Sequence, residues 1–276
     1  MLACVFTAEL IAPVLLPPHE GPAASAPTIV RADPAPRTSL IGDRTVRLVN
    51  LGGPGAAQLL TRIAAGLGNA IDAVVGFWGP DWTRDIVVVA AGSDQQFEQS
   101  AGGGPASQWA DIAAVTVAER VDPVARTMVD ARIVLAPGAA HMTKGALRIV
   151  LSHELFHYAA RVDTALDAPR WLTEGVADFV ARPPTALPTG AASSVAALPT
   201  DDDLDDPGPQ RSLAYDRAWW FTRFVADTYG PGKLRELYVD ACGVGHSDLA
   251  TAVGQALGID VAGLLPRWQR WMAGHA

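Results

Sequence analysis

The chain has 276 residues, of which 49% are hydrophobic and 18% are charged, and its formal net charge is −8. This composition excludes an intrinsically disordered chain and is sufficient to bury one large core or two small ones. The negative charge argues against nucleic acid as a partner, because phosphates attract basic patches. The two cysteines, Cys4 and Cys242, are too few for a disulfide framework, and Cys242 is expected to be a buried small residue.

Residues 1–37 are expected to be an apolar leader followed by a linker rich in Pro and Ala. The apolar run is short for a bilayer span and lacks a basic start, so it fits the remainder of a signal peptide or membrane anchor. Cys4 and the residues before it faintly resemble the end of a lipoprotein box. The pattern slightly favours an exported or cell-envelope protein over a cytoplasmic one, and a membrane would be contacted only through this N-terminal anchor.

Residues 38–161 are expected to form an α/β half, the first part of an α+β fold. Alternating apolar residues indicate strands, and apolar residues at helical spacing indicate helices between them. Ser93 is a plausible N-cap and Phe97 the buried anchor of a short helix. The predicted strands are 44–51, 85–90, 111–118 and 131–136, and the predicted helices are 56–78 and 93–101. Together they predict a mixed sheet with helices against it.

A polar motif, His153-Glu154-Leu155-Phe156-His157, interrupts an apolar helix predicted over residues 143–161. His153 and His157 are four residues apart, so both imidazoles lie on one helix face and can bind one metal ion. Zinc suits them, since it accepts nitrogen ligands in tetrahedral geometry. Glu154 lies beside the metal, where a carboxylate can take a proton from zinc-bound water. These polar groups would be costly in such an apolar helix unless they were paired or bound to metal.

A second amphipathic helix is predicted to begin after Pro169, with the sequence WLTEGVADFV over residues 171–180. Glu174 and Asp178 lie one turn apart on one face of it. Glu174 can be the third protein ligand, which leaves one zinc position open for water. Asp178 can accept a hydrogen bond from the non-ligating nitrogen of a ligand histidine. A solvated helix face is the alternative for both carboxylates, and the motif just upstream argues against it.

HELFH followed by WLTEGVADF resembles the gluzincin zinc metallopeptidases, and more closely the bacterial peptidase MA-like domains. The resemblance is specific over residues 143–180 and looser in the flanking regions, and thermolysin itself is a distant comparison. It implies a thermolysin-like catalytic domain in which His153, His157 and Glu174 hold one zinc ion per chain. Glu154 would then be the general base. The implied substrate is a peptide or protein, although the same residues would fit another amide.

The same resemblance implies a substrate-binding edge and an oxyanion donor. In gluzincins the edge strand before the active-site helix binds extended peptide as an added strand, here near residues 112–117. An ordinary edge strand is the alternative. A later Tyr or His often donates to the oxyanion in this family. Tyr215 is our candidate for this catalytic role and His246 is its rival, and a structural role is the alternative for each.

Residues 162–276 are expected to form a helical half that completes one catalytic domain, with the cleft between the two halves. The acidic run 201–206 lacks the spacing of an EF-hand, so we expect a solvated loop that could rim the cleft.

A catalytically inactive zinc-binding or interaction domain of the same fold is the alternative function. The intact Glu154 argues against it, because a metal site alone needs no base. The further predicted helices are 212–229, 233–241, 247–257 and 261–272.

Overall fold

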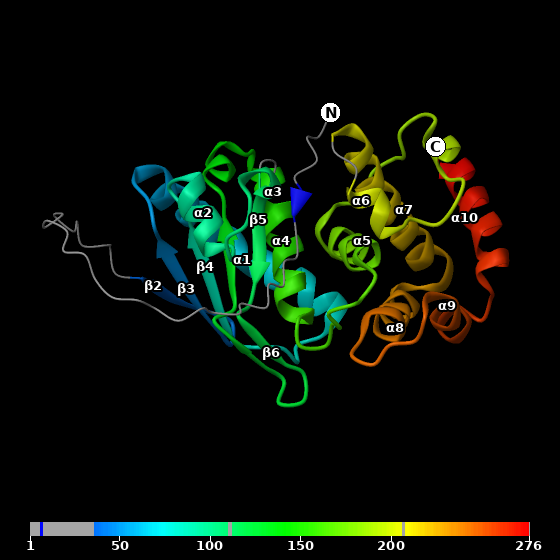
Figure 1. The fold of residues 1–276 in the computed structure, drawn as a ribbon, viewed down its shortest axis with the longest axis horizontal. Coiled ribbons are helices and arrows are strands. Elements are labelled where there is room, and N and C mark those ends of the chain that lie inside the picture. The colour runs from blue at the N-terminus through cyan, green and yellow to red at the C-terminus, as the bar shows by residue number, and fades with distance from the viewer. Residues whose placement is uncertain (1–5, 8–35, 110–111, 206–207, 276) are drawn as a thin grey trace, which may run out of the picture.

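The computed structural model describes residues 6–7, 36–109, 112–205 and 208–275. A sheet-bearing N-terminal part and a helical C-terminal part lie side by side (Figure 1). The strands are β1 (Phe6–Thr7), β2 (Arg37–Ile41), β3 (Arg44–Asn50), β4 (Asp85–Ala90), β5 (Ile112–Val117), β6 (Arg120–Asp122), β7 (Thr127–Val129) and β8 (Arg132–Leu135). The α-helices are α1 (Pro54–Trp78), α2 (Asp94–Ser100), α3 (Ala106–Trp109), α4 (Lys144–Ala160), α5 (Arg170–Ala181), α6 (Asp201–Asp205), α7 (Pro209–Tyr229), α8 (Pro231–Cys242), α9 (Leu249–Leu257) and α10 (Val261–His275). Two 3₁₀ turns are η1 (Pro137–His141) and η2 (Ala191–Ser194).

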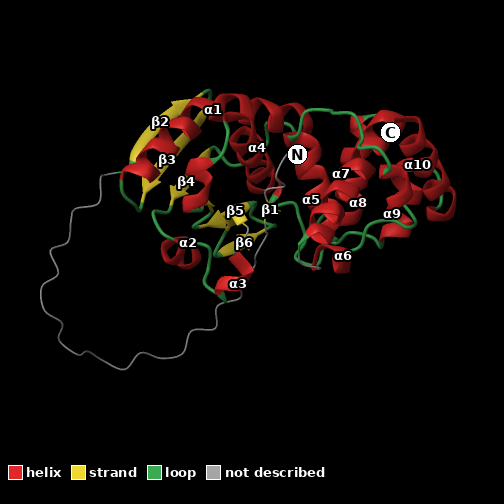
Figure 2. Ribbon diagram, turned by 90° about the horizontal axis from the view of Figure 1, so that it is seen from above, coloured by secondary structure: helices red, strands yellow, loops and turns green. Residues whose placement is uncertain are grey.

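The main sheet is mixed, with strand order β1-β5-β8-β4-β3-β2. β4 is parallel to both β3 and β8, whereas β2 and β5 are antiparallel to their inner neighbours. The mixed sheet and the mostly helical remainder that the sequence predicts are therefore confirmed at this level (Figure 2). Between β5 and β8 the chain forms a small antiparallel hairpin, β6–β7, which the sequence analysis did not predict.

Helices cover both faces of the sheet. α1 joins the parallel strands β3 and β4, and its buried face includes Ile63, Leu67 and Val74. Although α1 is long and apolar enough to cross a bilayer, this face packs in the core beside α4. α2 and α3 cover the opposite face, where Phe97 and Trp109 make an edge-on ring contact. α4 is thus enclosed between α1, the sheet and α5, which explains its nearly uniform apolar character.

The sheet has two strands, β1 and β2, that the sequence analysis missed. Both change the description of the N-terminal region. β2 begins at Arg37, which was expected to close an unstructured linker. β1 pairs in parallel with β5 at Ile112 and Ala114, so the outermost strand on that side is β1. The expectation that residues 112–117 form the edge is therefore wrong, because a short N-terminal strand adds to it. Cys4 and the rest of the expected leader and linker lie outside the described residues.

The acidic run is not the solvated loop that its composition indicates. It forms the short helix α6, and the Asp201 carboxylate accepts hydrogen bonds from the backbone N–H groups of Arg170 and Trp171, at 3.1 and 2.8 Å. These are two of the orphan donors at the N-terminus of α5, so Asp201 caps that helix from 30 residues away. Asp205 pairs with the Arg170 side chain at 2.6 Å. The run therefore fastens α6 to the start of α5.

Two sets of contacts join the halves. Edge-on aromatic contacts connect Trp78 of α1, Phe156 of α4 and Tyr238 of α8, with ring centroids 5.3 to 5.7 Å apart. α5 packs against α4 on one side and α7 on the other. As a result, α4 and α5 meet along their length in the interior, and the two motifs found in the sequence lie on facing helices.

Candidate metal centre

The centre is built on α4. Thr143 caps the helix by accepting a hydrogen bond from the Ala146 N–H at 3.2 Å, which fixes where the helix begins. His153 and His157 then lie one turn apart on the face toward α5, and both are buried. Their Nε2 atoms lie 3.0 Å apart, so the two imidazoles point at one place.

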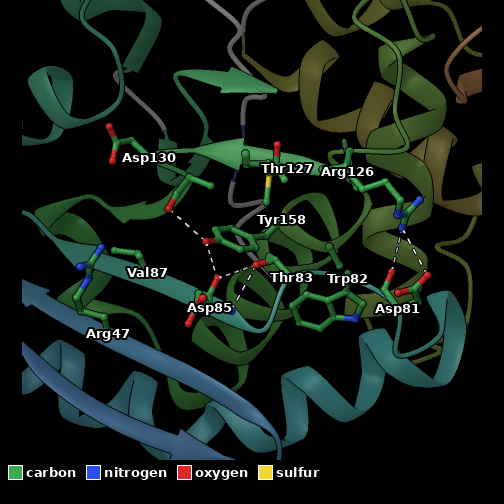
Figure 3. Close-up of a pocket in the computed structure, with 14 residues that line it drawn as sticks. Arg47, Asp81, Trp82, Thr83, Asp85, Val87, Arg126, Thr127, Asp130 and Tyr158 are labelled. Atoms are coloured by element: carbon green, nitrogen blue, oxygen red, sulfur yellow. Dashed lines mark hydrogen bonds and ion pairs between the residues drawn. The ribbon is translucent and has the colours of Figure 1, made fainter. Parts of the chain in front are cut away.

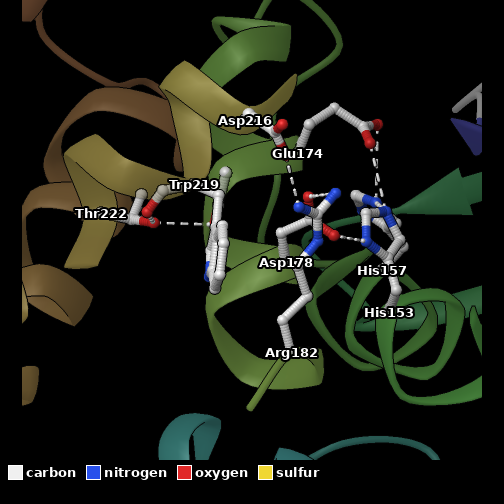
Figure 4. A network of polar contacts seen from close by, with 9 residues as sticks. His153, His157, Glu174, Asp178, Arg182, Asp216, Trp219 and Thr222 are labelled. Carbon is white, nitrogen blue, oxygen red and sulfur yellow. Dashed lines mark hydrogen bonds and ion pairs between the residues drawn. The ribbon is translucent and has the colours of Figure 1, made fainter. Parts of the chain in front are cut away.

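Glu174 of α5 completes the cluster (Figure 4). Its Oε2 lies 3.1 Å from Nε2 of His153, and its Oε1 lies 3.6 Å from Nε2 of His157. Each of the three residues offers a ligand atom within 4.8 Å of the other two. Ligand atoms at the usual ~2.0–2.1 Å from a tetrahedral zinc ion lie about 3.3 Å from one another. Two imidazole nitrogens and one carboxylate at these separations therefore fit zinc in both chemistry and spacing.

The electrostatics of the cluster also favour a cation. Burial disfavours the charged form of His153, but hydrogen bonds to Asp178 and Glu174 outweigh it and raise its pKa to about 9. Burial also disfavours the Glu174 carboxylate, yet the charges of His157 and His153 lower its pKa to about 2. The buried cluster thus stabilises an ionised Glu174 and positive charge beside it, and a divalent cation would supply that charge in place of the proton.

Asp178 lies behind His153, on the side away from Glu174. Its Oδ1 is 3.0 Å from Nδ1 of His153, while Nε2 of the same ring faces the cluster. A carboxylate at Nδ1 makes that nitrogen the donor and leaves Nε2 to bind a metal. The arrangement follows from the sequence spacing, because Glu174 and Asp178 are one turn apart on α5 and address opposite nitrogens of one imidazole.

Glu154 lies next to the cluster and is held by a residue that the sequence analysis missed. The Thr116 hydroxyl, on β5, lies 2.7 Å from Oε2 of Glu154 and 2.9 Å from its backbone carbonyl. Oε1 of Glu154 is buried and has no hydrogen-bond partner among the described residues. Burial raises the pKa of Glu154. The two oxygens of this carboxylate are therefore not equivalent, because only Oε2 is held by a hydrogen bond. The sequence signal that could have identified Thr116 is that it carries the one hydroxyl group in the otherwise apolar strand β5.

The two candidate oxyanion donors lie in different surroundings. Tyr215 is buried near the start of α7, where burial, and then the charge of Glu174, raise its pKa well above the ordinary value. This places the phenol in the electrostatic field of the cluster. His246 instead lies in the loop before α9, 3.4 Å from Asp167 and hydrogen-bonded to the Ser247 carbonyl. The charge of Glu174 thus acts on Tyr215, whereas the contacts of His246 are with Asp167 and Ser247.

Two cavities, of about 510 and 640 Å³, lie at the end of the sheet near the β6–β7 hairpin. The first is lined by residues such as Arg47, Asp85 and Tyr158 (Figure 3), and neither cavity is lined by His153, His157 or Glu174. Tyr158 follows His157 directly on α4 and therefore points about 100° away from it. Its hydroxyl donates to the backbone carbonyls of Asp85, in β4, and Ala131, just before β8, so it joins α4 to the sheet region.

No protein-family model matches the chain, and no curated protein matches it. Among solved structures, one that is similar is a glutamate-to-alanine mutant of a two-domain M1 zinc metallopeptidase bound to L-arginine. The TM-score is 0.46 and the sequence identity 16%, over 87% of this chain and 52% of that one. The chain thus spans about half the length of that peptidase.

Proposed function

We propose that the chain is a zinc-dependent peptidase of the gluzincin type. The observation that carries this proposal is the buried cluster of His153, His157 and Glu174 with the Glu154 carboxylate beside it. A purely structural metal site would use a closed set of four protein ligands. Among the described residues this cluster has three, and its neighbour is a carboxylate with one oxygen left for proton transfer.

Each residue has a role in the proposed reaction. Bound zinc lowers the pKa of water and polarises a carbonyl oxygen. Glu154 accepts the proton of the attacking water on Oε1 and delivers it to the amine that leaves when the C–N bond breaks. Thr116 keeps the carboxylate in place during both transfers. Tyr215 is the proposed donor to the oxygen on which negative charge develops.

A peptide is the proposed substrate. β5 carries Thr116, whose contact with Glu154 places this part of the strand next to the base. β1 pairs with β5 at Ile112 and Ala114, so a peptide that lies along Thr116, beyond these two pairs, would run past the proton-transfer group.

The alternative, a zinc-binding domain without activity, is favoured by one observation. His153, His157, Glu154 and Glu174 are at most 3% exposed, so water and substrate reach them only when the surroundings open. The two functions differ in one measurable property, because both bind zinc but only the peptidase turns over substrate.

Chelation of the metal separates them. Hydrolysis of a mixture of fluorogenic peptides should disappear when the purified protein is dialysed against a chelator, and should return when one equivalent of zinc is added. Hydrolysis that survives chelation would contradict a zinc mechanism. Stoichiometric zinc binding without hydrolysis of any peptide in the mixture would favour the inactive domain.

A further inference from the structure

We infer that Arg182 and Asp216 are positioning residues of the metal centre: they hold the Asp178 carboxylate, and through it the His153 imidazole, in the orientation that zinc binding requires. The inference rests on the proposed zinc site and adds to it two residues that act on His153 through Asp178. It follows from a continuous line of polar contacts that leads out of the cluster (Figure 4).

The contacts of Asp178 are divided between its two oxygens. Oδ1 lies 3.0 Å from Nδ1 of His153. Oδ2 forms an ion pair with Nη2 of Arg182, at 2.8 Å. The other terminal nitrogen of Arg182 donates to Oδ1 of Asp216 on α7, at 2.7 Å. The guanidinium therefore bridges two carboxylates from different helices, and one of them is the partner of a metal ligand.

The sequence and the local structure explain why an arginine is found here. Asp178 and Arg182 are four residues apart at the end of α5, so their side chains lie on the same side of the helix. The planar guanidinium presents two nitrogens in fixed directions, whereas a lysine offers one point charge. Arg182 also lies over the Trp219 ring at 4.9 Å, which limits its movement, and its side chain is only 14% exposed.

This arrangement matters because a ligand histidine binds metal well only when its ring is already oriented. A carboxylate held at one oxygen alone can rotate about its side chain and carry the imidazole with it. Anchoring Oδ2 removes that freedom before the metal arrives. Asp216 fixes the guanidinium in turn. Because Arg182 and Asp216 have opposite charges, the pair acts on the centre through geometry and contributes little net charge.

The test is zinc affinity, measured by competition with a chromogenic chelator, for a variant that removes both positioning residues and conserves net charge. The double substitution Arg182→Gln with Asp216→Asn should weaken zinc binding by about 10-fold or more, the usual effect of losing support behind a ligand. Arg182→Lys alone should bind zinc with an intermediate affinity, because an ammonium can keep one of the two contacts.

The matched control is Arg217→Gln with Asp203→Asn. This pair also joins α7 to another helix, and its arginine side chain is likewise 14% exposed, but it lies outside the polar line of the metal centre. Its zinc affinity should stay within about twofold of wild type, as expected for a partly exposed ion pair. Thermal melts of the zinc-free proteins check that the two double variants are folded to a similar extent.

Cobalt(II) in place of zinc gives a second readout, since its visible absorption reports ligand geometry. The band should change in the Arg182 and Asp216 double variant and not in the control. Wild-type zinc affinity and an unchanged cobalt spectrum in that variant would overturn the inference while leaving the zinc site standing. A wild-type protein that binds no zinc would instead overturn the proposed function, and this inference with it.

Discussion

Replacing Glu154 with Gln should leave zinc bound and lower peptide hydrolysis by about 10²–10⁴-fold, the range expected for loss of a general acid–base group. The amide is nearly the same size as the carboxylate, and its oxygen can still accept the hydrogen bond from Thr116. It cannot take up a proton at neutral pH. The substitution therefore removes the proposed proton transfer and keeps the packing of α4.

The measurement is kcat/KM on a peptide identified from the mixture, together with zinc content, for Glu154→Gln and for Glu119→Gln. Glu119 is exposed just beyond β5, so its substitution controls for the chemical change alone. Retained turnover in Glu154→Gln would exclude Glu154 as the base. Loss of zinc in the same variant would show that Glu154 supports the metal site itself.

Replacing Gly175 with Ala should destabilise the protein and weaken zinc binding at once. A Cβ at this position would lie 2.7 Å from the carbonyl oxygen of Ala218 on α7, and 3.1 Å from a Thr222 methyl group. The Thr222 hydroxyl donates to the Gly175 carbonyl at 2.9 Å, so the helices are fixed at this close approach. Overpacking of this kind costs about 1–3 kcal/mol of unfolding free energy. Because Glu174 precedes Gly175, any shift of α5 displaces a zinc ligand.

Urea unfolding of Gly175→Ala beside Gly76→Ala checks this expectation. Gly76 is an exposed helical glycine of α1, and a Cβ there would meet nothing within 4 Å. The control should be neutral or more stable by about 0.5–1 kcal/mol, because Ala is favoured over Gly in a helix. A Gly175→Ala protein as stable as the Gly76→Ala control would show that α5 and α7 are not held at the observed separation.

The local part of this structure could be predicted from the sequence. Helical spacing located α1, α4, α5 and the C-terminal helices, because each buries an apolar face that recurs every three to four residues. The same periodicity put His153 and His157 on one face of α4 before any packing was known. The one-turn spacing of Glu174 and Asp178 also follows from α5 alone.

The rest depends on contacts between residues far apart in sequence. Thr116 and Glu154 are 38 positions apart, and Asp201 caps a helix that begins 31 positions earlier at Arg170. A run of aspartates has the composition of a solvated loop, and only the nearby helix terminus gives it a structural role. Likewise, Arg182 follows a helical motif as an ordinary charged residue, and its bridge to Asp216 appears only once α7 packs against α5.

The β1 strand was missed for a related reason. Two residues are too few to show an alternating pattern of apolar and polar side chains. Phe6 and Thr7 become a strand because they pair with the backbone at the outer edge of β5, and not because of a local sequence signal. Only the first residue of β2, Arg37, was placed in the expected linker, because it follows a segment rich in Pro and Ala, and the rest of β2 was not predicted as a strand.

The central claim is that His153, His157 and Glu174 hold one zinc ion. Elemental analysis of the purified protein, beside Glu174→Ala, tests it most directly. We predict about one zinc per chain in the wild type and much less in Glu174→Ala, because one of three protein ligands is removed. A wild type without zinc, purified in the absence of chelators, or a Glu174→Ala protein with as much zinc as wild type, would contradict it.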